Sequence, residues 1–348
     1  MKLFRLPLAV TAAVIVGVAA WRPSLVGVVV ILGILEVSFS FDNAVVNAKI
    51  LAQMPASWQR VFLTVGVLIA VVGMRLLFPL IVVSLGGHMS PLRALSLGVN
   101  EPKRYQQILT GAHPAVISFG GIFLLMIFLD WVLEKKDPQW LRPLESMLER
   151  LGRLDQVSVV IALLALASVS QLAAPGKRLS VIFAGTVGLV AYLVINMADS
   201  YFEQEEGVSK EEVAVRTQVV SMPFKVGLAT FLYLEVLDAS FSFDGVMGAF
   251  AVTTNIFAIM IGLGIGALFV RTLTVYLVNK GTLRDYIYVD HGAHWAIGAL
   301  AAISLYSIKY AVSEYVTGLI GVAFITAAVV SSIFARCHQA DETSTVTT

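Results

Sequence analysis

The stretches LEVSFSFDNAVVNA (35–48) and VLDASFSFDGVMGA (236–249) place the same five residues, SFSFD, at two points of one chain. Each stretch lies inside a long apolar run, and each has further acidic residues just upstream of its aspartate. A charged side chain inside a bilayer costs on the order of 2.5–3.5 kcal/mol. Duplicated acids in such segments therefore indicate a functional site within a membrane.

The composition indicates a polytopic membrane protein. Of the 348 residues, 58% are hydrophobic and 14% are charged, and the mean hydropathy is +0.84. A soluble domain of this length needs more polar surface. The net charge of +1 gives no case for a nucleic-acid partner. The single cysteine, Cys337, excludes an internal disulfide and a thiolate cluster for a soft metal.

Apolar segments predict an all-α fold, a polytopic membrane helical bundle, because about 20 helical residues cross a bilayer. The segments are 5–20, 24–52, 61–86, 115–133, 157–174, 179–198, 226–252, 255–279, 294–311 and 314–335. The first, fifth and sixth are short, so we expect nine or ten transmembrane helices. The N-terminal segment 1–20 is expected to be either the first of these helices or a cleaved signal peptide.

The chain is expected to divide into two membrane halves, 1–174 and 175–335, followed by a disordered tail, 336–348. The first half contains a loop, 134–156, predicted to carry a short amphipathic helix, and the second an acidic loop, 199–225. Fifteen of the 24 Lys and Arg residues fall on the N-terminal side of the spans, seven fall opposite and two lie within spans. The bias predicts a multi-pass protein of the plasma (inner) membrane with both termini in the cytoplasm.

Three blocks recur in the same order, which indicates an internal duplication. Besides the SFSFD stretches, residues 66–80 match residues 262–276, which aligns Arg75 with Arg271. Residues 105–121 match residues 286–302, which aligns His113 with His294. The two SFSFD copies lie on the second and the seventh predicted spans, five positions apart, so they are expected to cross the membrane in opposite directions. Such an inverted repeat is typical of transporters, whose site lies where the halves meet.

Each duplicated stretch is expected to be a broken helix. Asp42 follows Glu36 by six residues, as Asp244 follows Asp238, which in a continuous helix is about 240° of rotation and about 9 Å of rise. The members of each pair would then lie on different faces. The alternation of Ser and Phe, with Asn43 or Gly245 after the aspartate, favours an unwound, extended segment with serines and aspartate on one side. Broken helices at the midplane also leave carbonyls free to bind ions.

These groups predict a site for a hard divalent cation, because all of the candidate ligands are oxygens. The cation would be a cargo, and no permanently bound cofactor is expected. The candidate ligands are Glu36, Asp42, Asn43, Glu235, Asp238 and Asp244, with Ser38, Ser40, Ser240, Ser242, Arg75 and Arg271 in supporting positions. A structural alternative has Asp42 and Asp244 neutralising Arg75 and Arg271. The two histidines of the GAH blocks are expected to cap or flank spans.

At LEVSFSFDNAVVNA and LDASFSFDGVMGAFA, the chain resembles the TerC-like integral membrane proteins, in a branch of unknown function. The resemblance extends from about residue 25 to 335, with its sharpest motifs at 36–47 and 235–251. It implies an inner-membrane protein with a role in manganese export and metal homeostasis. Glu36, Asp42 and Asn43 match the first acidic motif, and Glu235, Asp238 and Asp244 match the second. The SFSFD symmetry and the large inserted loops depart from the family pattern, which leaves the cargo open.

Three functions are therefore compared. The first is a non-enzymatic transporter, an exporter, of a divalent cation, with Mn²⁺ as the expected cargo. The second is a membrane scaffold that assists metallation or secretion of partner proteins without moving ions. The third is an intramembrane aspartyl protease, which needs two membrane aspartates, although its Gly-x-Gly-Asp context is missing from this chain.

Overall fold

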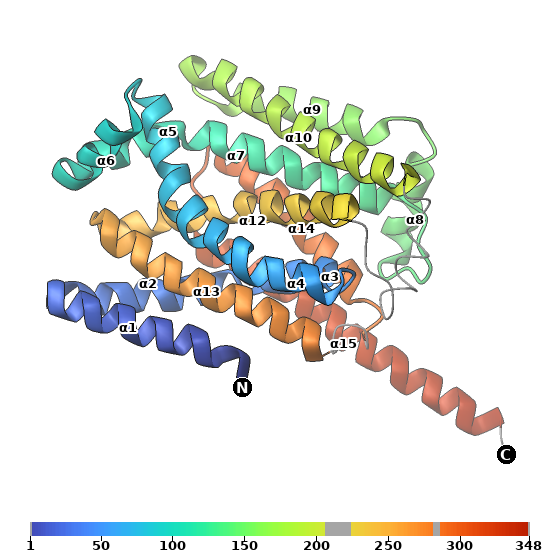
Figure 1. Ribbon diagram of the computed structural model, residues 1–348. Helices are drawn as coiled ribbons and strands as arrows, with labels where there is room; N and C mark the ends of the chain where they lie inside the picture. Colours follow the sequence, from blue (N-terminus) through green and yellow to red (C-terminus); the bar gives the residue numbers. More distant parts are fainter. Residues whose placement is uncertain (1, 206–223, 281–285, 347–348) are drawn as a thin grey trace.

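The computed structural model describes residues 2–205, 224–280 and 286–346, and this part of the chain is helical and without strands. The expected all-α bundle is therefore confirmed (Figure 1). Most of the acidic loop 199–225 lies outside the described residues.

Each of the ten predicted segments contains a helix, and several helices extend beyond the predicted limits. The elements are η1 (Lys2–Phe4), α1 (Arg5–Trp21), η2 (Pro23–Leu25), α2 (Val26–Phe39), α3 (Phe41–Leu51), α4 (Ala56–Val61), η3 (Phe62–Gly66), η4 (Ile69–Leu77), α5 (Phe78–Gly86), α6 (Pro91–Asn100), α7 (Pro102–Leu133), α8 (Arg142–Leu151), α9 (Val157–Leu172), η5 (Pro175–Lys177), α10 (Arg178–Glu205), α12 (Phe224–Val252), α13 (Ile256–Lys280), α14 (Val289–Ser307) and α15 (Glu314–Val346).

Fewer helices than the expected nine or ten are long and apolar enough to cross a membrane. Among the described residues six meet this description, or seven if the bent pair of α2 and α3 counts as one span. The helices α1 and α9 are apolar but have only 17 and 16 residues. Helix α14 has 19 residues but opens with Asp290 and His291, which lowers its hydropathy.

Helix α7 is the centre of the bundle. It packs against α10 on one side and α14 on another, and it also contacts α12 (Figure 1). The largest buried cluster forms here, from Phe123, Met126 and Ile127 of α7 and from facing residues of the neighbouring helices. A second group of contacts joins α13 to α2, α3 and η4. The SFSFD segments lie where these two groups of helices meet.

The expected break is confirmed in the first SFSFD copy and is wrong in the second, and the extended conformation expected for both is wrong. Helix α12 runs without interruption from Phe224 to Val252. In the first copy α2 ends at Phe39 and α3 begins at Phe41, with a bend of 54° at Ser40. The bond from Ser40 N to Glu36 O closes α2, and the bond from Ala44 N to Ser40 O opens α3. Each unpaired backbone group inside a bilayer costs several kcal/mol, so the break in the first copy is confined to Ser40 and neither copy forms an extended segment.

The two copies do run in opposite directions, as an inverted repeat requires. In Figure 1, α2 begins beside the end of α1 and leads into α3, while α12 starts at the α3 end of the bundle and finishes at the end where α2 begins. The segment 134–156 contains the expected short amphipathic helix, α8. The tail differs from expectation, because α15 continues to Val346 in a sequence that lacks Gly and Pro after Gly321.

Candidate functional site

Two buried arginines divide the five acids of the SFSFD region into those that are paired and those that are not. Arg75, from η4, forms an ion pair with Glu36 of α2. Arg271, from α13, bonds both oxygens of Glu235 at 2.7 and 3.0 Å and Asp238 Oδ2 at 2.8 Å. The suggestion that Asp42 and Asp244 neutralise these arginines is therefore wrong.

These ion pairs follow the sequence repeat. Aligning the two SFSFD stretches places Glu36 opposite Asp238, and the neighbouring block places Arg75 opposite Arg271. Each upstream acid thus pairs with the arginine of its own repeat. Glu235 is an addition to the second repeat, where the first has Gly33. Breaking such a buried pair is costly because it leaves one charge uncompensated.

The repeats also contact each other in a reciprocal way. Asn43 Nδ2 of the first repeat donates to Asp238 Oδ1 of the second at 2.8 Å. The equivalent of Asn43 is Gly245, and a Cβ added there would lie 2.9 Å from Glu36 Oε2, the equivalent acid of the first repeat. In both cases the residue after the SFSFD aspartate of one repeat lies against the upstream acid of the other repeat. Such reciprocal contacts are expected when two halves are related by a two-fold axis. With antiparallel α2 and α12, this relation is that of an inverted repeat.

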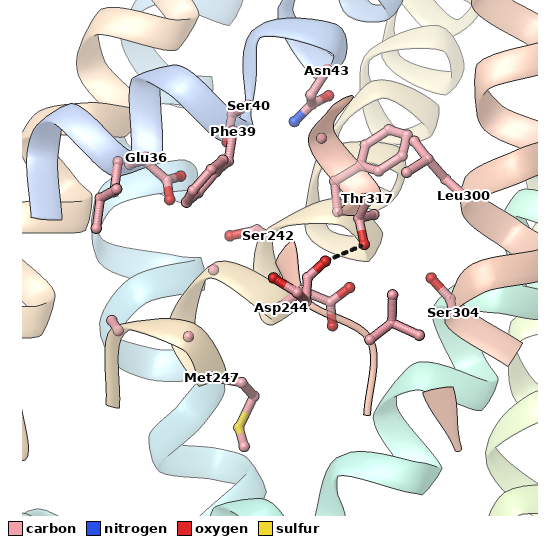
Figure 2. Close-up of a pocket in the computed structure, with 18 of the residues that line it drawn as sticks. Glu36, Phe39, Ser40, Asn43, Ser242, Asp244, Met247, Leu300, Ser304 and Thr317 are labelled. Carbon is pink, nitrogen blue, oxygen red and sulfur yellow. Dashed lines mark hydrogen bonds between the residues drawn. The ribbon is translucent and has the colours of Figure 1, made fainter. Parts of the chain in front are cut away.

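A cavity of about 430 Å³ lies between the two SFSFD segments. Its wall includes Glu36, Ser40, Asp42 and Asn43 from the first copy and Ser240, Ser242, Asp244 and Gly245 from the second. Figure 2 shows Glu36 and Phe39 on one side of this space, Asp244 near its middle, and Ser304 and Thr317 of α14 and α15 on the far side. The cavity wall is otherwise mostly apolar.

Asp42 and Asp244 are the two cavity carboxylates without an arginine. Asp42 is 4% exposed, and its Oδ1 accepts a hydrogen bond from the backbone N–H of Asn43 at 2.9 Å. Asp244 is half-buried and makes no hydrogen bond or ion pair with another described residue. Two further cavity atoms, Asn43 Oδ1 and Ser242 Oγ, are buried without a partner. Unsatisfied oxygens around a cavity are suited to a cation or to water.

The structure separates the six predicted ligands into two groups. Glu36, Asp42, Asn43 and Asp244 line the cavity, whereas Glu235 and Asp238 belong to the Arg271 cluster outside it. Across the described residues, no three His, Cys, Asp or Glu side chains stand close enough together to hold a metal ion. Any cation in the cavity would therefore depend on two carboxylates supplemented by hydroxyl, amide or water oxygens.

The serines also differ in role. Ser38 Oγ and Ser240 Oγ donate back to the carbonyls of Ile34 and Val236 at 2.8 and 2.9 Å, within their own helices. Ser40 and Ser242 line the cavity along with Ser240. The sequence could not separate them, because all four stand in the same SFSF pattern.

Several polar residues of the cavity wall, among them His113, Ser304 and Thr317, were not predicted as part of the site. His113 was expected at the entrance of a span, but α7 starts at Pro102, so His113 lies well inside the helix and lines the cavity, with its ring 6.0 Å from that of Phe243. The repeated GAH block was a usable signal for it. Ser304 and Thr317 carried no such signal, because hydroxyl residues are common in membrane helices.

A bundle of long apolar helices, with a carboxylate-lined cavity between two inverted repeats, defines a polytopic integral membrane protein. The chain belongs to the family described as "Protein of unknown function (DUF475)", whose profile matches residues 41–339. It is also 35% identical over 100 residues to the "Uncharacterized membrane protein YceF" of Bacillus subtilis (strain 168), a match that covers 28% of this chain and 35% of that protein. The chain thus matches about a third of the length of this curated relative. No protein of solved structure is similar at a significant level.

Proposed function

We propose that the protein is a secondary transporter, an exporter, that moves a divalent metal cation across the plasma (inner) membrane by alternating access. The observation that carries the proposal is the pair Asp42 and Asp244, two carboxylates from oppositely directed repeats that face one cavity without an arginine partner. An anionic pair inside a membrane requires a cation or protons. A cargo cation that binds and leaves would meet this requirement only transiently, as transport demands.

The chemistry of the wall favours a hard cation. Asp42, Asp244, Asn43 Oδ1 and Ser242 Oγ supply carboxylate, amide and hydroxyl oxygens, and the described cavity wall contains no thiolate. Such oxygen sets suit Mg²⁺, Ca²⁺ or Mn²⁺. The resemblance of the SFSFD motifs to TerC-like proteins favours Mn²⁺ among these. We propose no enzymatic activity and no permanently bound cofactor.

Flux into proteoliposomes tests the proposal. Purified protein is reconstituted, and uptake of Mn²⁺, Mg²⁺, Ca²⁺ and Zn²⁺ is followed with and without a proton gradient. Asp42→Asn and Asp244→Asn keep the size of each side chain but remove its charge, and each is expected to reduce Mn²⁺ flux at least tenfold. Glu101→Gln, at an exposed acid on the surface, is the matched control and should leave flux unchanged.

The reconstitution also has outcomes that contradict the proposal. Wild-type protein that is folded and correctly inserted but moves none of the four ions would exclude a role as a transporter of these divalent cations and favour a scaffold. Equal flux in wild type and both aspartate variants would leave a transporter whose ion path lies elsewhere. Either result removes the assigned role of Asp42 and Asp244.

A further inference from the structure

The two SFSFD copies have the same sequence but different shapes. The first is bent by 54° at Ser40, whereas the second is straight through the equivalent residue, Ser242. The local side-chain bonding is the same in both, because Ser38 and Ser240 each donate to the carbonyl four residues earlier. The five identical residues therefore tolerate both shapes, and contacts elsewhere must select between them.

One selecting contact reaches Asp238 from α3, the helix that starts directly after the bend. Asn43 and Asn47, one turn apart on α3, donate their amides to Asp238 Oδ1 at 2.8 and 3.4 Å. We call this contact the asparagine latch. It joins the bent copy to the straight one, and it is buried, since Asn47 is 1% exposed.

The asparagine latch exists on one side only. The residues of α12 equivalent to Asn43 and Asn47 are Gly245 and Ala249, which have no amide to offer Glu36. Both halves of the inverted repeat thus share an ion pair between the upstream acid and the arginine, but only one half has this asparagine contact. A two-fold pseudo-symmetric structure with one bent and one straight member allows a second arrangement, in which the two shapes are exchanged.

We propose that the protein alternates between this structure and one in which α12 bends at Ser242 while α2 and α3 join into one straight helix across Ser40. The asparagine latch holds the state seen here, and its release accompanies the exchange. The proposal rests on the proposed function, since the exchange would carry the cavity between Asp42 and Asp244 from one side of the membrane to the other.

Distances between pairs of spin labels on each copy test the exchange. With Cys337→Ser as parent, labels are attached through cysteines at Ile31 and Gln53 across the first bend, or at Leu228 and Val252 along α12; three of these sites are more than a third exposed, and Gln53 is also exposed. At 1.5 Å of rise per residue, a 54° bend at Ser242 shortens the α12 distance by about 4 Å. Straightening at Ser40 lengthens the other distance by about as much.

The variant Asn47→Ala is used to shift the equilibrium toward the exchanged state, because it removes one hydrogen bond of the asparagine latch. Asn47 does not line the cavity, and Ala is the residue that the second repeat carries at the equivalent position. Loss of one amide donor is expected to raise the ratio of the exchanged to the observed state about fivefold. Asn100→Ala is the control, because it removes an asparagine amide bond to Ser96 at the surface and should leave both distance distributions unchanged. The parent is also measured with and without Mn²⁺, so the test does not depend on one variant.

The expected result is a longer distance across Ser40 together with a shorter distance along α12, in Asn47→Ala or on addition of Mn²⁺. Distances that stay fixed under all conditions, or an α12 distance that never shortens, overturn the exchange. The two proposals fail separately. Ion flux with a permanently straight α12 removes the exchange and keeps transport, whereas coupled distance changes without flux remove transport and keep the exchange.

Discussion

At the scale of single residues, the arginines decide what each acid can do. Arg75 and Arg271 neutralise the upstream acids of both repeats, and Arg271 also lies 4.1 Å from the ring of Phe62. Asp42 and Asp244 have no arginine partner, so their charge must be balanced by a bound cation or removed by a proton. The acids that hold the bundle together are thus distinct from those that face the cavity.

The position of Asp42 depends on one glycine of α15, and this gives a sharp prediction. A Cβ added at Gly321 would overlap Asp42 Oδ2 and lie 2.8 Å from Asp42 Cβ and Cγ. Gly321→Ala must therefore displace the carboxylate or α15. Overpacking of this kind costs about 1–3 kcal/mol. We expect Gly321→Ala to lower the unfolding temperature in detergent by several degrees and to reduce Mn²⁺ flux.

Gly318, one turn earlier on the same helix, is the matched control. A Cβ there would meet Phe39 at 3.5 Å or more, which is ordinary van der Waals contact. Gly318→Ala should match wild type in both measurements. If Gly321→Ala behaved like Gly318→Ala, the close packing of α15 on Asp42 would be disproved.

Residue identities were predictable from the sequence, but their pairing was not. The duplicated motif identified five acids and two arginines, and all seven are brought into the same region of the bundle. Which acid meets Arg75 depends on the rotation of α2 against η4, which no sequence spacing fixes. From the sequence, Glu36 and Asp42 were both candidate metal ligands, and only the packed structure shows that Glu36 pairs with Arg75 while Asp42 does not.

At the scale of elements, helix positions were predicted better than helix shapes. The apolar runs located every membrane segment, because burial in lipid requires continuous apolar helices. The alternation in SFSFD predicts an extended segment, whereas the second copy is a continuous helix and the first is interrupted only at Ser40. An alternating side-chain pattern is weak evidence for an extended segment inside a membrane, because each unpaired backbone group there would face hydrocarbon.

Helix α8, outside the membrane-spanning segments, is held against α14 by its buried residue Glu145. The stability of this contact is therefore expected to depend on pH. Glu145 Oε1 accepts hydrogen bonds from His291 Nδ1 at 3.0 Å and Trp295 Nε1 at 3.1 Å. Burial disfavours the charged form, but these bonds outweigh it and lower the pKa of Glu145 from its usual 4.5. Since the pKa is lowered in the folded state, its stabilisation is full above about pH 4.5 and is lost as pH falls through the lower folded value.

Hydrogen exchange of the α8 amides measures this docking. At pH 7, Glu145→Gln should speed exchange in residues 142–151 about tenfold, which corresponds to loss of about 1.4 kcal/mol from a charge-assisted bond. Glu149→Gln, one turn further along α8, should leave exchange near the wild-type rate, because its partner Gln139 lies in the preceding loop. Exchange in α8 that is unaffected by Glu145→Gln, or protection that rises below pH 4, would contradict the assignment.

At the scale of the whole molecule, the helix ends gather at two opposite ends of the bundle. In Figure 1, α3, α8 and the start of α12 lie at one end of the bundle, and α6 and the connection between α12 and α13 lie at the other. The first end gathers the segments that carry most of the basic residues, among them Lys49, Lys136 and Arg142. The positive-inside rule predicts that this end faces the cytoplasm. The repeat explains why the count of crossings matters, since inversion of the two SFSFD copies requires an even number of crossings between them.

Cysteine labelling tests this orientation and the role of α14 together. Between Gly176 and Cys337 stand α10, α12, α13, α14 and α15. All but α14 are long and apolar enough to cross, so with those four as spans the two positions face opposite sides only if α14 also crosses. An α14 of 19 residues is about 28 Å long, close to the roughly 30 Å of a bilayer core.

In intact cells, an impermeant maleimide should not react with Cys337 until the membrane is permeabilised. It should react at once with the single cysteine of a Gly176→Cys, Cys337→Ser variant, at an exposed connection with open space around it. Labelling of both positions from the same side would mean that α14 does not cross, and α14 could then not be the inverted counterpart of α7. The reverse pattern would keep the fold and turn the whole bundle over in the membrane.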